Sequence, residues 1–145
     1  MREILFKAKR IDNGKWIEGY YQKRYNLLGN EEHLIFHADS YKVWEYAEID
    51  PETLCQFTGL YDKNGNRIWD NDILMAHLDE SCPEDATYET VEWGVTGWVT
   101  HEANSIDRHC LDKFDLEHFE VVGNIFDNPE LLQEESDFEE KRNEK

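Results

Sequence analysis

The stretch DKNGNRIWDNDI, which begins at Asp62, spaces oxygen-bearing side chains like the ligands of a calcium loop. Asp62, Asn64 and Asn66 alternate along it, as the first three ligands of such a loop do. The loop also needs glycine at position six and a bidentate glutamate at position twelve, where this chain has Arg67 and Ile73. Asn-Gly between two apolar segments is instead a strong hairpin signal. We predict a hairpin turn here and no calcium site.

Histidines and cysteines form two further candidate metal sites. His33 and His37 are four residues apart, the spacing of two ligands on one helix face. The apolar LIF between them favours a strand, along which they would lie about 13 Å apart, too far for one ion. A zinc ion would need four dispersed residues to converge without any CxxC motif: Cys82, His101, His109 and Cys110. We expect neither metal site to exist.

Carboxylates follow the hairpin segment in a run that a metal-dependent hydrolase could use. Such an enzyme gathers two or three carboxylates around an ion, and the candidates are Asp70, Asp72, Asp79, Glu80, Glu84 and Asp85. With 33 acidic residues in the chain, local groups of this kind arise by chance. The phosphate-loop pattern GxxxxGKS or GxxxxGKT and the nucleophile pattern GxSxG are absent. We predict no catalytic, cofactor-binding or metal-binding residues, and no enzyme.

The elements that must position these residues are mostly strands. Alternating apolar residues, or short apolar runs between turn signals, predict strands at 2–10, 15–21, 33–39, 41–49, 57–61, 67–69, 73–78, 90–94, 97–101 and 119–127. A turn is expected at Asp12-Asn13-Gly14, and loops at 26–32 and 79–89. Gly123 inside the last strand indicates a bulge or a close backbone approach. Short strands between turn signals predict a sandwich or a small barrel.

Helical structure is expected only in short pieces. Asp50 and Asn128 each precede a proline, which indicates a capped helical turn at 50–56 and another after Asn128. Residues 102–115 show no clear pattern. The acidic tail 134–145 is predicted to be a frayed helix or disordered.

The composition bounds the class of protein. A chain of 145 residues with 39% hydrophobic and 13% aromatic content can bury the core of one domain or of two small ones. Its three cysteines are odd in number and widely spaced, so we expect reduced thiols. No apolar run approaches the ~20 residues of a membrane helix, and the first residues lack a signal-peptide pattern. We expect a cytoplasmic protein without a membrane segment.

Charge is distributed unevenly along the chain. The net charge is −18, but residues 1–24 carry seven basic and three acidic residues, which is +4. The remainder carries 8 basic and 30 acidic residues, which is −22. This acidity disfavours direct nucleic-acid binding. The basic strands could pair with acidic neighbours within the fold or in a second subunit, or could form a nucleic-acid arm.

Four segments together resemble the YopX family of phage and prophage proteins. They are the amino-terminal MREILFKAKR, then IDPETLCQFTGL, TGLYDKNGNRIWDNDIL and the carboxy-terminal VVGNIFDNPELL. The resemblance spans residues 1–133, with variable segments at 24–40 and 77–118. One departure is Asn71, which stands where the family usually has glycine. Asparagine also tolerates left-handed backbone, so we expect the same turn with slight strain.

The resemblance implies a fold and a setting rather than a chemistry. It implies a mainly β protein of short antiparallel strands: an amino-terminal β segment at 1–49, an SH3-like barrel at 50–133 with one or two short helices, and the tail at 134–145. It also implies a phage or prophage origin in a bacterial cell, and no established activity. The shared residues are then structural: Gly59, Gly65, Asp62 and Asp72 for turns, and Asn128 and Pro129 for the last helix.

Two functional hypotheses from different classes remain. The first is a non-catalytic protein-interaction module that presents a binding edge or an aromatic face to an unknown protein partner, and that could form a homo-oligomer. The alternative is an acidic decoy that imitates the charge of DNA and occupies a host nucleic-acid-binding protein. A metal-dependent hydrolase ranks third, because no catalytic spacing supports it.

Overall fold

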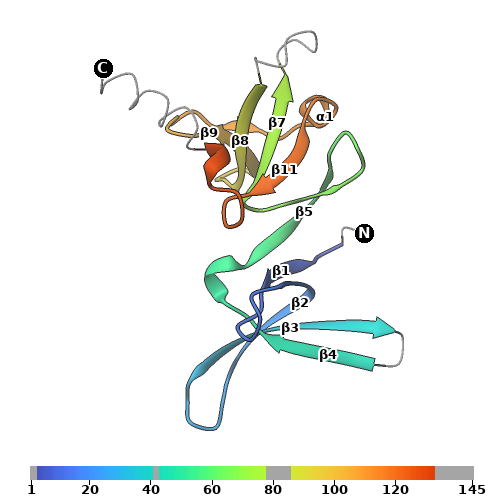
Figure 1. Cartoon of the computed structure of the whole chain (residues 1–145), viewed down its shortest axis with the longest axis vertical. Helices are drawn as coiled ribbons and strands as arrows, with labels where there is room; N and C mark the ends of the chain where they lie inside the picture. The colour runs from blue at the N-terminus through green and yellow to red at the C-terminus, as the bar shows by residue number, and fades with distance from the viewer. Residues whose placement is uncertain (1–2, 41–42, 78–85, 133–145) are drawn as a thin grey trace. The chain divides into compact units, whose positions relative to one another are not determined.

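The structure is a computed structural model that describes residues 3–40, 43–77 and 86–132, which are mainly β. Their strands form two antiparallel sheets, and each of two short helices joins two strands of the same sheet (Figure 1). The chain divides into two compact units, Met1–Gly59 and Leu60–Lys145. The mainly β class predicted from the sequence is confirmed, while the predicted domain division at residue 49 stays a prediction.

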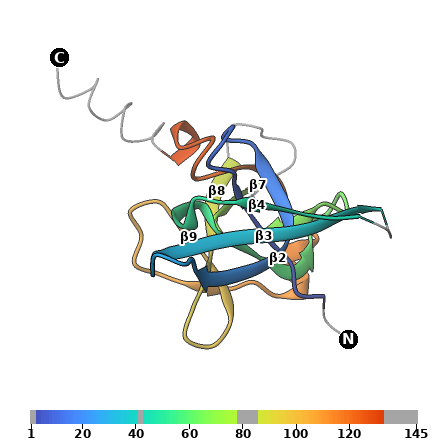
Figure 2. The same ribbon diagram turned by 90° about the horizontal axis from the view of Figure 1, so that it is seen from below.

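The first unit is built from long hairpins. Its elements are β1 (Phe6–Lys9), β2 (Trp16–Tyr25), β3 (Glu31–Ser40), β4 (Val43–Glu48), the 3₁₀ turn η1 (Pro51–Thr53) and most of β5 (Cys55–Tyr61). The strand order is β4-β3-β2-β1-β5, with each of the pairs from β4 to β5 antiparallel. β3 and β4 run side by side away from the core (Figure 1 and Figure 2).

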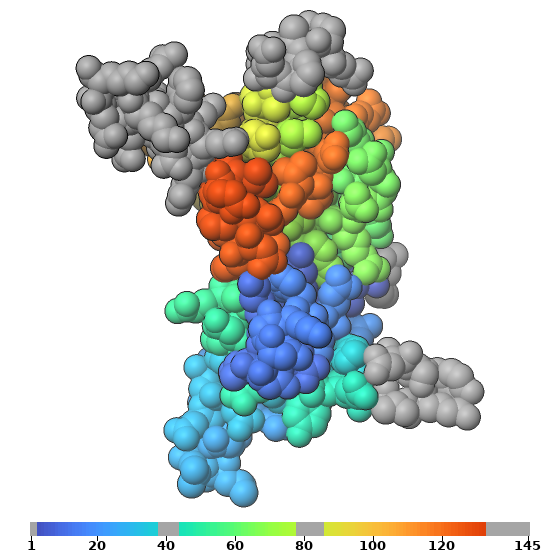
Figure 3. All heavy atoms as spheres, in the orientation of Figure 1, coloured from blue at the N-terminus to red at the C-terminus, as the bar shows by residue number. Residues whose placement is uncertain are grey.

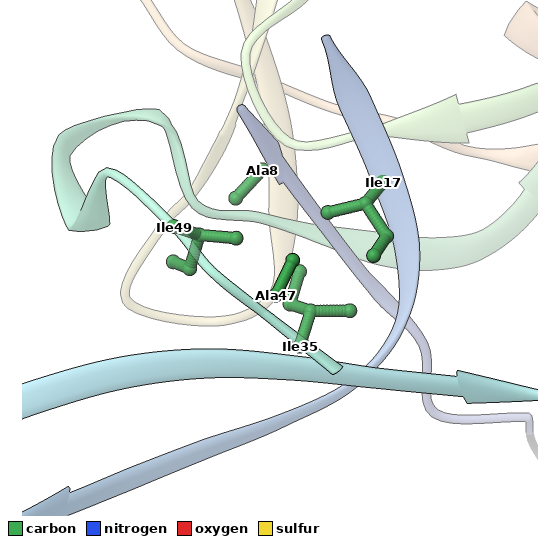
Figure 4. Close-up of a cluster of buried hydrophobic side chains, with 5 residues drawn as sticks. All are labelled: Ala8, Ile17, Ile35, Ala47 and Ile49. Carbon is green, nitrogen blue, oxygen red and sulfur yellow. The ribbon is translucent and has the colours of Figure 1, made fainter. Parts of the chain in front are cut away.

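Alternation along these strands sends one apolar face into a common core. Ala8 lies opposite Ile17 in the β1–β2 pair, and Ile35 lies opposite Ala47 in the β3–β4 pair. Together with Ile49 they form a buried cluster (Figure 4). Residues directly opposite each other in a ladder point to the same side of the sheet, so the next residues along each strand point to the other side, where Leu34 is also buried.

The end of β1 returns to the end of β4. Arg10 forms a bridge with Ile49, and the N–H of Ile11 donates to the carbonyl oxygen of Glu48 at 3.0 Å. Because β2 and β3 separate these strands in the sheet, the bridge curls the sheet around its core. The part of β4 before Glu48 extends beyond this closure.

The second unit holds a five-stranded antiparallel sheet and a hairpin. Its elements are the end of β5, β6 (Arg67–Trp69), β7 (Asp72–His77), β8 (Ala86–Trp93), β9 (Trp98–Glu102), β10 (His109–Cys110), α1 (Lys113–Leu116) and β11 (Glu120–Asn124). The sheet order is β10-β9-β8-β7-β11. Five residues make up its buried cluster: Ile68, Leu74, Val91, Leu111 and Phe119. No helix in the described part of the chain has the length and apolar character that a membrane crossing requires.

The predicted loop at 79–89 is wrong in its last part. β8 begins at Ala86 and pairs with β7, with Ala86 opposite His77 and Thr87 opposite Ala76. The acidic composition of this stretch suggested a loop, but its threonines and tyrosine suit a strand that has a neighbour to pair with. The rest of the predicted loop lies outside the described residues.

The helical turn predicted after Asn128 is present at residues 130–132, whereas the one predicted at 50–56 is shorter than expected. Asp50 caps η1 through a bond from the N–H of Glu52, as predicted, but the turn stops at Thr53 because Leu54 is extended and Cys55 pairs with Lys7. Residues 102–115, which had no pattern, contain β10 and α1. The predicted tail helix at 134–145 lies outside the described residues.

Candidate interaction surface

The DKNGN stretch is a hairpin turn, as predicted. The Oδ1 atom of Asp62 accepts hydrogen bonds from the backbone N–H groups of Asn64 at 2.9 Å and Asn66 at 2.8 Å. Gly65 takes a φ of 81°, the left-handed conformation that the turn requires. The other carboxylate oxygen accepts from the N–H of Val121 at 3.0 Å. Both carboxylate oxygens of Asp62, which a cation would need as ligands, therefore accept hydrogen bonds from backbone N–H groups instead.

The same hydrogen bonds keep Asp62 ionised. Burial raises the pKa of this carboxyl, but the N–H groups of Val121, Asn66 and Asn64 lower it by more, so the pKa lies below its ordinary value. Asp62 is thus an ionised carboxylate whose hydrogen bonds join the β5–β6 hairpin to β11. Its role is structural, as the family resemblance implied.

Asp70 and Asp72 have separate environments. Asp72 is buried, and its Oδ2 accepts from the N–H of Trp69 at 2.8 Å. Burial raises the pKa of Asp70 to about 6, against the lowering effect of the Asn71 N–H and with a further rise from Glu92. Asn71 between them has a φ of 69°, so the expected left-handed turn is confirmed. The other four carboxylates of the predicted run lie outside the described residues.

His33 and His37 have different partners along β3. The Nδ1 of His33 lies 2.5 Å from the hydroxyl oxygen of Tyr21. The Nε2 of His37 lies 3.6 Å from the Oε2 of Glu45. The strand predicted for this segment is confirmed, and each histidine is engaged by a side chain of a neighbouring strand.

The residues of the other candidate metal site are spread over two strands. His101 on β9 has its Nε2 at 3.4 Å from the Oε2 of Glu92. His109 on β10 pairs with Thr100, and the Cys110 thiol next to it is exposed. Cys82 lies outside the described residues. Among the residues that the structure describes, no three His, Cys, Asp or Glu side chains group closely enough to hold a metal ion.

A polar pocket lies between β8, β9, β10 and α1. At its floor the hydroxyl of Thr100 donates to the Oε1 of Glu89 at 3.2 Å. Burial raises the pKa of Glu89, the Thr100 bond opposes the rise, and the negative charge of Glu102 adds to it. Asp112 and Asp115 at the start of α1 also line the pocket. Its lining thus combines four carboxylates with the basic side chain of Arg108 and the ring of His109.

The hairpin between β2 and β3 displays two leucines at its tip. Leu27 and Leu28 have relative exposures of 106% and 86%, so neither packs against the protein. The turn is held by Asn26, whose Oδ1 accepts from the N–H groups of Leu28 and Asn30, both at 2.9 Å. Gly29 supplies a φ of 82°. The hairpin projects from the first unit as a narrow lobe (Figure 3).

Aromatic side chains gather on the outward face of β2, β3 and β4. Tyr20, Phe36 and Tyr46 are directly opposite one another in three adjacent strands. The rings of Phe36 and Tyr46 have centroids 5.5 Å apart, and those of Tyr20 and Trp44 are 6.0 Å apart. Tyr20, Trp44 and Tyr46 are each more than half exposed. The sequence hypothesis of an aromatic binding face named no residues for it, and it did not identify the leucine tip.

Comparison with known proteins gives a family and a fold. The family model described as YopX protein matches residues 5–133. Among solved structures, the crystal structure of protein EF1440 from Enterococcus faecalis is similar with a TM-score of 0.59 and 19% sequence identity. The match covers 91% of this chain and 99% of that one, and at this identity it shows the fold alone. A search of curated proteins finds no match.

Proposed function

The chain belongs to the YopX family, and from its exposed leucine tip we propose that it is a non-catalytic protein-interaction module. The tip, defined as residues 26–30, is the observation that carries the proposal. Turn positions favour Gly, Asn, Asp and Ser, and here Asn26 and Gly29 already supply the required geometry. The two leucines between them are almost fully exposed, so the fold gains little from their apolar surface.

The tip is ready to bind without reordering. Because Asn26 accepts two backbone N–H bonds across the turn, the leucines are displayed on a preformed loop. A preorganised group loses less conformational entropy on binding than a flexible one. Burying a leucine side chain is worth about 1.5–3 kcal/mol, so two adjacent leucines could anchor a modest interface.

Charges beside the tip favour a protein pocket as its target. Lys23 lies 2.5 Å from a carboxylate oxygen of Glu31, and Arg24 lies 3.0 Å from one of Glu32. These pairs leave the stem of the hairpin near neutrality. A loop that inserts into anionic membranes, or one that binds nucleic acid, uses an unpaired basic surface. The neutral stem and apolar tip instead suit an apolar pocket on a protein partner.

A capture experiment tests this function. Tagged full-length chain is used to capture proteins from a lysate of the bacterial host during phage induction, and bound proteins are identified by mass spectrometry. Leu27→Ser with Leu28→Ser should lose a partner that the unchanged chain retains. Ile106→Ser, at a site that is 93% exposed, is the matched control and should keep it. Equal capture by all three chains would refute the tip as the binding element.

The proposal includes a cellular location. On the family resemblance, we propose that the protein lies in the cytoplasm of a bacterial cell that carries a phage or prophage.

We also propose that residues 50–133 form an SH3-like barrel. Two hydrogen bonds support the barrel. The backbone N–H of Lys63 donates to the carbonyl oxygen of Phe119 at 3.1 Å, and the backbone N–H of Val121 donates to the carboxylate of Asp62. They bring the β5–β6 hairpin to the free side of β11.

A second candidate function is the acidic decoy, and the separation of charge favours it. The first unit has 8 basic and 10 acidic residues, a net charge of −2. The second unit has 7 basic and 23 acidic residues, a net charge of −16. A decoy would bind a DNA-binding protein with an affinity that falls steeply as salt rises. A captured partner that stays bound when salt is raised from 50 to 500 mM would remove this candidate.

A further inference from the structure

β4 ends the sheet of the first unit with an unpaired edge. The N–H of Ile49 donates to the carbonyl oxygen of His33, so odd-numbered residues of this segment direct their backbone groups toward β3. In an antiparallel ladder these directions alternate, and Trp44 and Tyr46 must direct theirs away from β3. The next residue of this kind is Glu48, whose carbonyl oxygen already accepts a hydrogen bond from the N–H of Ile11. In the described ranges, no strand pairs with this edge before that closure.

The residues of the free edge also carry exposed aromatic side chains. Trp44 and Tyr46 have relative exposures of 61% and 58%, and both belong to the outer aromatic face. An exposed edge with apolar side chains is a template for pairing with another strand. Both the backbone and the side chains at this place can therefore be satisfied by one added strand.

The charge of the chain indicates where two copies can meet. The second unit carries −16, and two such units brought together would repel each other. The first unit carries −2, so close approach of two first units costs little electrostatic energy. An isologous contact, in which the same surface of both copies meets across a two-fold axis, is also the commonest arrangement of homodimers.

We propose that two copies of the chain pair antiparallel through β4, about a two-fold axis at Glu45, which makes one continuous sheet. In this register Trp44 of each copy lies opposite Tyr46 of the other. Both residues direct their backbone groups to the free edge, so each opposed pair can exchange two N–H···O bonds. The rings then form aromatic cross-strand pairs, which stabilise antiparallel sheets.

Like charges at the axis are the main cost of this register. Glu45 of one copy would lie opposite Glu45 of the other, which is destabilising in a strand pair. A histidine and an arginine lie near each of these carboxylates within the chain. His37 has its Nε2 at 3.6 Å from the Oε2 of Glu45, and Arg10, bonded chiefly to Asp12, also interacts with the charge of Glu45. These neighbours reduce the repulsion without cancelling it.

The contact is short, so the dimer is expected to be weak. An interface of one strand edge falls at the small end of specific contacts, and a dissociation constant on the order of 10–100 µM is expected. This interface is separate from the leucine tip, and it goes beyond the proposed function. A failure of self-association would leave capture of a partner through the tip unaffected.

Sedimentation velocity of the full chain between 5 and 500 µM in 150 mM salt tests the proposal. The average mass should rise toward that of a dimer with concentration. Trp44→Lys with Tyr46→Lys should abolish the rise, because charged edge residues block strand addition. Tyr20→Lys, on the same face but on the inner strand β2, is the matched control and should dimerise like the unchanged chain. Circular dichroism confirms that each variant is folded.

Glu45→Gln gives a readout that only this register predicts. Removing the like charges at the axis should tighten the dimer several-fold, without altering the edge. A chain that stays monomeric at 500 µM overturns the proposal. So does a dimer that survives both lysine substitutions, or one that is unchanged or weakened by Glu45→Gln.

Discussion

The carboxylate of Asp62 accepts a hydrogen bond from the backbone N–H of Val121, which lies 59 positions further along the chain. The same carboxylate closes the Asn64-Gly65 turn through two more backbone bonds. One side chain therefore forms a local turn and ties it to β11. The polar residues of the family signature are explained by such bonds, and the interaction surface that we propose lies elsewhere.

Removing the Asp62 carboxylate should strongly destabilise the second unit. Asp62→Ala leaves three backbone N–H groups without their acceptor, and we expect a loss of about 3 kcal/mol in the free energy of unfolding. Asp62→Asn keeps an acceptor but loses the charge, so its cost should be smaller. Urea denaturation measures both, with the exposed Asp107→Ala as control. A change below 1 kcal/mol for Asp62→Ala would contradict the structural role.

Asp70 should make stability depend on pH between about 4 and about 6. Its pKa is raised by burial from 3.8 to about 6 in the folded protein, so folding favours the protonated acid. Stability contributed by this group is therefore greatest at low pH and falls as pH rises through that window. Asp70→Asn should remove the dependence and add about 1 kcal/mol at pH 7, discounted for partial exposure.

The difference in unfolding free energy between the unchanged chain and Asp70→Asn, followed from pH 4 to pH 8, measures this effect. Other carboxyl groups titrate in both proteins and cancel in the difference. A difference that is constant with pH would show that Asp70 keeps its ordinary pKa.

Gly123 should tolerate no side chain. A Cβ there would lie 2.4 Å from the Oδ1 of Asn128, whose oxygen accepts from the N–H of Asn124 at 3.2 Å. Gly123→Ala is expected to cost about 2 kcal/mol, because the overlap must displace a bonded side chain. The cost should shrink when Asn128→Gly is present. Thermal unfolding of the four proteins of this double-mutant cycle checks the coupling, and purely additive effects would argue against a clash.

Asn71 should be replaceable by glycine but not by alanine. Its φ of 69° is tolerated by Asn and Gly and costs other residues roughly 1–2 kcal/mol. Asn71→Ala is therefore expected to lower stability by about 1 kcal/mol, while Asn71→Gly should be neutral or slightly stabilising. Urea midpoints for the two variants make the test. Equal losses from both would point to a role for the asparagine side chain.

Local turn chemistry explains why part of the fold could be predicted. Asn64-Gly65 specifies a hairpin by itself, and Gly123 indicated the irregularity that the register shift between Val121 and Gly123 confirms. β10 could not be found, since it has only two residues, too few to show alternation, and is a strand only through its pairing with β9. Asn128 was predicted as a helix cap, but its side-chain oxygen accepts a bond from Asn124 in the preceding turn.

The two proposed interaction surfaces could not be located from the sequence for a related reason. The sequence around Leu27 and Leu28 predicts a loop, but it does not distinguish leucines that pack against the protein from leucines that extend into solvent. Only the geometry of the hairpin separates the two cases. The free edge at Trp44 and Tyr46 likewise depends on the order of strands in the sheet, which alternation does not determine.

Site-specific photo-crosslinking at Leu28 tests the central claim most directly. A benzophenone amino acid is placed at Leu28, or at Ile106 as the matched exposed control, and cells are irradiated during phage induction. We predict a discrete adduct with one protein partner from position 28, identified by mass spectrometry, and none from position 106. No adduct at position 28, or the same adducts from both positions, would contradict the account.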